Sequence, residues 1–217
     1  MTFYIALTSN DHAILAIDDC LTHLDDSGTK VVRRESTPKL YRVNDATVAA
    51  GSGAHPFTNA WCGRHLPAVL TSAVDRSQLR RSAPGMRAAL LADHGRFCGV
   101  ANPQHDTSAT LIVAGVDASG LPFLLATHSP DFDIVILDQE CNVVTSRVKN
   151  ETCIDIPGFV GRMRSVRSEL SERDLVAWAC REVVMLIRTA SRFDSGVGSA
   201  GQIAVVGPSR TTRIWAF

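Results

Sequence analysis

The chain of 217 residues is 45% hydrophobic and carries 22 basic and 22 acidic side chains. This length and apolar content suffice for the core of a single domain spanning residues 1–217. The balanced charge lacks the basic excess of nucleic-acid-binding and membrane-surface proteins, so neither partner is expected. No apolar run is long enough to span a membrane and no leader pattern precedes the first strand, which favours a cytoplasmic location.

The six cysteines and seven histidines are scattered along the chain. The cysteines form no C-x-x-C pair and have apolar neighbours, which predicts buried free thiols in a reducing compartment. The histidines show no i, i+4 pair and no clustered spacing. Neither a metal site nor a cofactor is therefore expected.

The first fifty residues predict two β-hairpins separated by a polar stretch, His23–Pro38. The strands of the first hairpin are expected at Thr2–Leu7 and Ala13–Asp18. Those of the second are expected at Lys39–Val43 and Thr47–Gly51. Turn-forming residues lie between the strands of each pair.

Helical segments are expected in two later regions. The first region comprises Phe57–Leu70 and Met86–His94, with a break at Pro84-Gly85. The second is a long helix opened by Ser171, with Asp174 three residues on as in a capping box. Apolar residues occupy most of its circumference, which predicts burial on nearly every side.

Six further strands complete the predicted pattern. They are expected at Thr110–Val116, Leu121–Thr127, Asp133–Leu137, Asn142–Val148, Ile203–Val206 and Thr212–Ala216. Runs of strands interrupted by runs of helices do not fit the regular alternation of a parallel sheet. The order predicts an α+β fold, a four-layer αββα sandwich of two antiparallel sheets flanked by helices.

Thr2 stands directly behind the initiator methionine, which is normally removed before a small side chain. Asp18 and Lys39 follow at the ends of strand-like runs, with Thr22 and Gly51 nearby. This spacing resembles the proteasome β-subunit family of N-terminal nucleophile hydrolases. The similarity is greatest to the short, divergent bacterial proteasome homologues, such as the β-proteobacterial proteasome homologue and the two-component ATP-dependent protease subunit.

The resemblance implies a threonine-type peptidase with Thr2 as its nucleophile. A threonine hydroxyl needs a proton acceptor to attack a carbonyl, and the freed α-amino group, with a pKa near ~8, is one. The Lys39 ammonium would favour the alkoxide, and Asp18 would keep that ammonium charged and oriented. The Gly51 N–H would stabilise the oxyanion.

Substrate-binding residues follow from the same resemblance. Thr22 is expected to hydrogen-bond the substrate backbone, while Leu21 and Ala49 are expected in the side-chain pocket. Asp194 and Ser199 are expected to support the nucleophile. The family also places a serine near residues 154–161, where this chain reads IDIPGFVG and has none.

Peptides or unfolded proteins are the expected substrates. Relatives enclose such sites, so a homo-oligomeric double ring of six or seven subunits per ring is expected. The chain has no ATP-binding loop, so an unfoldase would be a separate protein. Two alternatives stay open: a non-catalytic ring-forming subunit of the same fold, and an amidohydrolase of the same nucleophile class acting on small amides.

Overall fold

The structure is a computed structural model that describes residues 2–24, 30–33, 38–72, 75–101, 107–138, 141–146 and 154–217. The side chains of residues 22–24 and 30–33 also lie outside the description. In the part of the chain that is described, no helix is long and apolar enough to cross a membrane.

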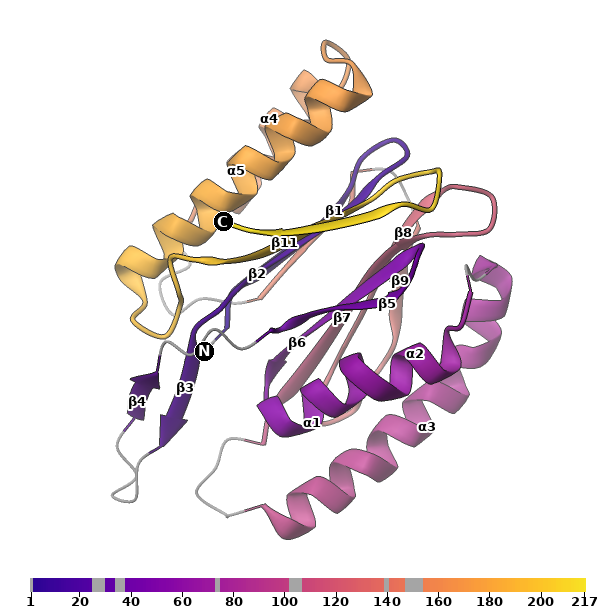
Figure 1. The fold of residues 1–217 in the computed structure, drawn as a ribbon, viewed down its shortest axis with the longest axis vertical. Helices are drawn as coiled ribbons and strands as arrows, with labels where there is room; N and C mark the ends of the chain where they lie inside the picture. Colours follow the sequence, from indigo (N-terminus) through magenta and orange to yellow (C-terminus); the bar gives the residue numbers. More distant parts are fainter. Residues whose placement is uncertain are drawn as a thin grey trace.

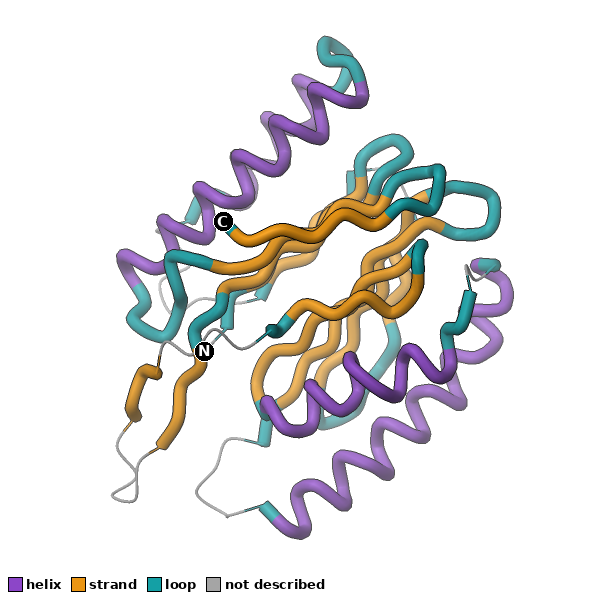
Figure 2. Tube along the Cα trace, in the orientation of Figure 1, coloured by secondary structure: helices purple, strands orange, loops and turns teal. Residues whose placement is uncertain are grey.

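One antiparallel sheet of five strands contains both ends of the described chain (Figures 1 and 2). Its strand order is β10 (Val143–Thr145), β1 (Tyr4–Thr8), β2 (Ala13–Asp18), β11 (Gly201–Val206) and β12 (Thr212–Ala216). Consecutive residues of β1 and β2 are all buried. Both faces of these central strands are therefore covered.

The second antiparallel sheet also has five strands, in an order that follows the sequence. These are β5 (Leu40–Asn44), β6 (Thr47–Gly53), β7 (Ala109–Val116), β8 (Pro122–His128) and β9 (Val135–Leu137). A separate two-stranded ribbon is formed by β3 (Leu21–Leu24) and β4 (Lys30–Arg33). This ribbon continues directly from the end of β2.

Helices cover the outer faces of both sheets, which gives a helix–sheet–sheet–helix order of layers (Figure 1). The first sheet is covered by α4 (Ile156–Val166) and α5 (Glu172–Phe193). The second is covered by α1 (His55–Ala60), the π-helical turn η1 (Trp61–His65), α2 (Leu66–Val69) and α3 (Arg76–Val100).

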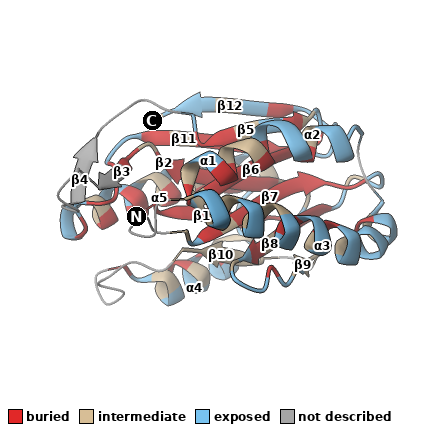
Figure 3. Ribbon diagram, turned by 90° about the horizontal axis from the view of Figure 1, so that it is seen from below, coloured by how far each residue is buried: buried red, intermediate tan, exposed pale blue. Residues whose placement is uncertain are grey.

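Side-chain alternation along the strands divides the core into three layers. Ile5 and Leu7 of β1 pack against α4 and α5, whereas Tyr4 and Ala6 face the other sheet. In β7, Leu111 and Val113 face α1–α3, while its alternate residues face the first sheet. This period of two is the expected geometry of strands buried on both faces. Figure 3 shows central strands such as β7 mostly buried, whereas the edge strand β12 is mostly exposed.

Most predicted strands are confirmed within a few residues, and so is an α+β fold with two antiparallel sheets flanked by helices. The polar stretch His23–Pro38 contains regular structure, because the end of β3 and all of β4 lie in it and the two strands pair. The helix α4 was missing from the prediction. Its short sequence begins with Pro and Gly residues, which indicate a turn when read alone, yet Asp155 caps it by accepting a hydrogen bond from the Gly158 N–H at 2.8 Å.

Two helix predictions were wrong. The expected break at Pro84-Gly85 is absent, because α3 runs through Pro84 while Leu79, Met86 and Leu90 keep one buried face. Pro84 lies on the exposed side, where water can satisfy the freed carbonyl. The helix α5 is buried on one face only, since Met185 on the opposite face is 52% exposed.

The expectation of buried cysteines holds only in part. Cys20 and Cys62 are buried, whereas Cys98, Cys141 and Cys180 are half-buried. All five are free thiols, and the remaining one, Cys153, lies outside the described residues.

Candidate active site

Three side chains that are far apart in the sequence meet at one end of the sandwich. Lys39 Nζ lies 3.1 Å from Thr2 Oγ1 and 3.1 Å from Asp18 Oδ1. The exposed fractions of the three residues are 8% for Thr2, 0% for Asp18 and 2% for Lys39. The structure thus brings together the predicted nucleophile and both residues predicted to activate it.

The Lys39 ammonium has a partner for each of its three donors. Besides Thr2 Oγ1 and Asp18 Oδ1, it donates to the backbone carbonyl of Cys20. An ammonium has three N–H groups and no acceptor, so this arrangement satisfies it completely. The Thr2 hydroxyl oxygen accepts one of these bonds, which places a positive charge where an alkoxide would develop.

Asp18 also orients the backbone on either side of it. Its Oδ2 accepts from the Phe3 N–H at 2.5 Å, and its Oδ1 accepts from the Cys20 N–H at 2.7 Å. The Asp18 N–H in turn donates to the Phe3 carbonyl at 3.0 Å. Because Phe3 follows Thr2 directly, this pair of bonds fixes the main chain that carries the nucleophile.

The pKa of the Asp18 carboxyl is raised above its ordinary value, because burial removes water from the carboxylate. The charge of Lys39 and the N–H donors of Phe3 and Cys20 oppose this shift but do not cancel it.

The site is assembled from both sheets. Thr2 precedes β1 and Asp18 ends β2 in the first sheet, whereas Lys39 immediately precedes β5 in the second. Gln202 of β11 joins the two, since its Oε1 accepts from the Lys39 N–H at 3.3 Å and the Leu40 N–H at 3.4 Å. Gln202 was not predicted as a site residue, because a single amide inside an apolar strand forms no recognisable motif.

Gly51 lies on β6 next to the start of β5. The ladder pairs Leu40 with Ala50, so Gly51 is one step beyond that pair, level with Lys39. A Cβ atom at Gly51 would come within 2.4 Å of the Thr58 Cβ on α1. Packing of α1 against β6 therefore requires glycine here, and the oxyanion role of its N–H stays a prediction.

The predicted substrate-binding residues fall in different surroundings. Leu21 is buried at the start of β3, directly after Cys20. Thr22 is next on the same strand, and its side chain is outside the described part. Ala49 is fully buried in the core beneath α1–α3, together with Phe57.

Asp194 and Ser199 belong to the loop between α5 and β11. Asp194 is buried and its Oδ1 accepts from the Gly196 N–H at 2.8 Å, which holds the loop in place. Ser199 is exposed. The same loop packs against the site, since the Asp19 N–H donates to the Ala200 carbonyl at 3.1 Å.

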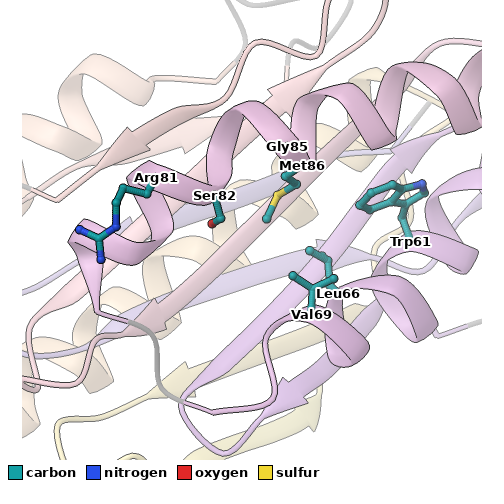
Figure 4. Close-up of a pocket in the computed structure, with 7 residues that line it drawn as sticks. All are labelled: Trp61, Leu66, Val69, Arg81, Ser82, Gly85 and Met86. Atoms are coloured by element: carbon teal, nitrogen blue, oxygen red, sulfur yellow. The ribbon is translucent and has the colours of Figure 1, made fainter.

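A pocket of about 330 Å³ lies elsewhere, in the helical layer outside the second sheet (Figure 4). It is lined mainly by apolar side chains of η1, α2 and α3, among them Trp61, Leu66 and Met86. None of its lining residues belongs to the Thr2 site. The pocket and the candidate chemistry are separate features.

No protein-family model matches this sequence, and a search of curated proteins finds no match.

Proposed function

We propose that this protein is a threonine-type peptidase subunit, with the fold and mechanism of an N-terminal nucleophile hydrolase, that cleaves peptide bonds through Thr2. The observation that carries the proposal is the buried Lys39 ammonium, placed 3.1 Å from both Thr2 Oγ1 and Asp18 Oδ1. A buried lysine and aspartate are costly to maintain, and replacement by apolar residues is often neutral or stabilising. Their position against a hydroxyl at the start of the chain supports a chemical role.

Removal of Met1 would leave the Thr2 hydroxyl and α-amino group on the same residue. In the proposed reaction, Oγ1 attacks the peptide carbonyl carbon while its proton passes to the α-amino group. Collapse of the tetrahedral intermediate breaks the C–N bond, and the leaving amine takes that proton. Water then hydrolyses the acyl ester and restores the hydroxyl.

Lys39 and Asp18 have distinct parts in this scheme. The Lys39 ammonium stabilises the developing alkoxide and disfavours protonation of the neighbouring amine. Asp18 holds the ammonium in place and fixes the Phe3 backbone. A backbone N–H at Gly51 would contribute roughly 3 kcal/mol to stabilising the oxyanion.

The proposal extends to a homo-oligomeric double ring that encloses the sites, with peptides or unfolded proteins as substrates. A separate ATP-dependent unfoldase would deliver folded substrates.

The decisive experiment compares Thr2→Ala with Thr2→Ser in the full-length protein. Thr2→Ser keeps a hydroxyl and an α-amino group, so we expect it to cleave fluorogenic peptides and to be labelled by a threonine-directed covalent inhibitor. Thr2→Ala should do neither. Intact-mass measurement should show that active protein lacks Met1, and cleavage by Thr2→Ala at the wild-type rate would refute the proposal.

One observation favours a second candidate, a non-catalytic subunit of the same fold. The proteasome β-subunit family, which the sequence resembles, carries a supporting serine near residues 154–161; in this chain that stretch leads into α4 and contains no serine. For this candidate, wild-type protein would assemble into rings yet take up no covalent inhibitor. The third candidate, a small-amide hydrolase, is distinguished by a monomeric or dimeric size in sedimentation.

A further inference from the structure

A second cluster of polar side chains lies at the opposite end of β1 and β2 from Thr2. His12 in the β1–β2 hairpin places its Nδ1 atom 2.5 Å from Asp11 Oδ1 and 3.0 Å from Glu172 Oε1. Glu172 is the first residue of α5, so the cluster joins two elements distant in sequence. The ligand atoms of all three side chains lie within 4.8 Å of one another.

Hydrogen bonding alone accounts poorly for this arrangement. The Asp11 and Glu172 carboxylates both lie within hydrogen-bond distance of the same nitrogen, which has at most one N–H, so the two would have to share that single donor. The side chains are only 22–42% exposed, so water screens their mutual repulsion incompletely. An ion at their centre would neutralise both carboxylates and use the Nδ1 lone pair.

We propose that Asp11, His12 and Glu172 bind one divalent transition-metal ion of the zinc type. One imidazole nitrogen with two carboxylate oxygens suits Zn²⁺, whereas Mg²⁺ and Ca²⁺ prefer oxygen ligands alone. Two ligands at about 2.1 Å from one ion lie about 3.0–3.4 Å apart, close to the His12–Glu172 distance. Asp11 would move outward by about half an ångström, which its position on an exposed turn allows.

Neighbouring groups hold the ligands in orientation. Ser9 Oγ donates to Glu172 Oε1 at 2.5 Å, and Asn10 Nδ2 donates to Glu172 Oε2 at 3.0 Å. A Cβ atom at Gly207 would come within 3.0 Å of His12 Nε2, so the far edge of the ring is covered and Nδ1 is the atom directed at the carboxylates. Such outer contacts are typical of metal sites, where they fix ligand orientation.

A metal ion bound by these residues would link the β1–β2 hairpin to the helix α5 that covers it. Binding would stabilise the packing of α5 on the first sheet without involving Thr2. The site is therefore independent of the proposed peptidase activity, and either proposal can fail alone.

The test is thermal unfolding of EDTA-treated full-length protein with added Zn²⁺. At a hundredfold excess over Kd, we expect Tm to rise by about 5–10 °C. Glu172→Gln should lose this rise, and so should Asp11→Asn, which changes a more exposed residue. Asp174→Asn is the matched control, because it removes the same charge from the same helical turn outside the cluster and should keep the rise.

Three results would overturn the proposal. These are no Tm change in the wild type, an equal rise in Glu172→Gln, and an equal rise with Mg²⁺. Substitution with Co²⁺ provides an independent readout. We expect visible absorption of nitrogen- and oxygen-ligated Co²⁺, and a thiolate charge-transfer band would instead assign the metal to cysteine.

Discussion

The buried charge of Lys39 contacts both the proposed nucleophile Thr2 and the carboxylate of Asp18. Its three donors are occupied by Thr2, Asp18 and the Cys20 carbonyl, and its side chain is almost fully shielded from water. Removing either member of a buried pair leaves the other charge without compensation, which costs more than the pair contributes.

We therefore expect Lys39→Met to lower the free energy of unfolding by about 3–5 kcal/mol and to abolish peptide cleavage. The double variant Asp18→Asn/Lys39→Met should lose less stability than Lys39→Met alone, because no buried charge remains. Urea unfolding measures the free energy of unfolding of the single and the double variant. Asp45→Asn is the control, since its pair with Arg42 spans 3.7 Å between residues 51% and 87% exposed and should contribute at most about 0.5 kcal/mol.

Asp18 should also give the protein a distinctive dependence of stability on pH. Burial raises the pKa of its carboxyl above 3.8, so the folded state binds this proton more tightly than the unfolded chain. The contribution of Asp18 to stability is then fully present below its unfolded pKa and is lost as pH rises through its folded pKa. Relative to Asp18→Asn, the wild type should lose unfolding free energy as pH increases through this window.

Urea unfolding of both proteins from about pH 3 to pH 7 measures this difference. A difference that grows with pH would mean that Lys39 and the N–H donors outweigh burial.

At the scale of elements, the start of α5 is defined by a single side chain. Ser171 Oγ accepts from the Asp174 N–H at 3.2 Å, as the capping pattern predicted. We expect Ser171→Ala to lower the free energy of unfolding by about 1 kcal/mol, because one helix N–H loses its acceptor. Ser168→Ala, on the exposed turn just before α5, should change stability by less than about 0.5 kcal/mol. Equal losses in the two variants would contradict the capping role.

The elements recoverable from the sequence are those with strong local signals. Continuous apolar runs bounded by turn residues located β1, β2 and β7, and Ser171 located α5. The ribbon β3–β4 was not predicted, because its strands have only four residues each and the segment between them is polar. The continuity of α3 was not predicted, because the local sequence shows the penalty of Pro84 but not the tertiary packing of Leu79, Met86 and Leu90 that outweighs it.

The candidate site was predictable where side-chain chemistry and spacing coincide, as for Thr2, Asp18 and Lys39. Contacts made by a backbone carbonyl or by one side-chain amide were not predicted. The Cys20 carbonyl and Gln202 Oε1 became visible only once the sheets were placed against each other. The cluster of Asp11, His12 and Glu172 was not predicted for a similar reason. Glu172 is far from the other two residues in the sequence, and the sequence shows no pair of histidines at ligand spacing.

Across the whole molecule, the layer between the two sheets is rich in alanine. Its buried members include Ala6, Ala13, Ala46, Ala50, Ala114 and Ala204. Small side chains let the sheets approach closely, and a well-packed layer of this kind has no room for added methylene groups.

We expect Ala114→Leu, at a fully buried position of β7, to destabilise the protein by about 1–3 kcal/mol. The rate of covalent inhibitor labelling at Thr2 should fall as well, because the sheets carry different members of the site. Ala88→Leu, on the exposed side of α3, makes the same substitution and should change neither quantity appreciably. Unaltered labelling in a destabilised Ala114→Leu protein would show that sheet spacing and reactivity are independent.

Because Thr2 precedes a strand of one sheet and Lys39 precedes a strand of the other, the proposed reactivity would require the two sheets to stay packed together. In a partly unfolded molecule, the Thr2 hydroxyl would have no lysine ammonium beside it. In the proposed peptidase this coupling would be a safeguard, because damage that separates the sheets would also remove the activity.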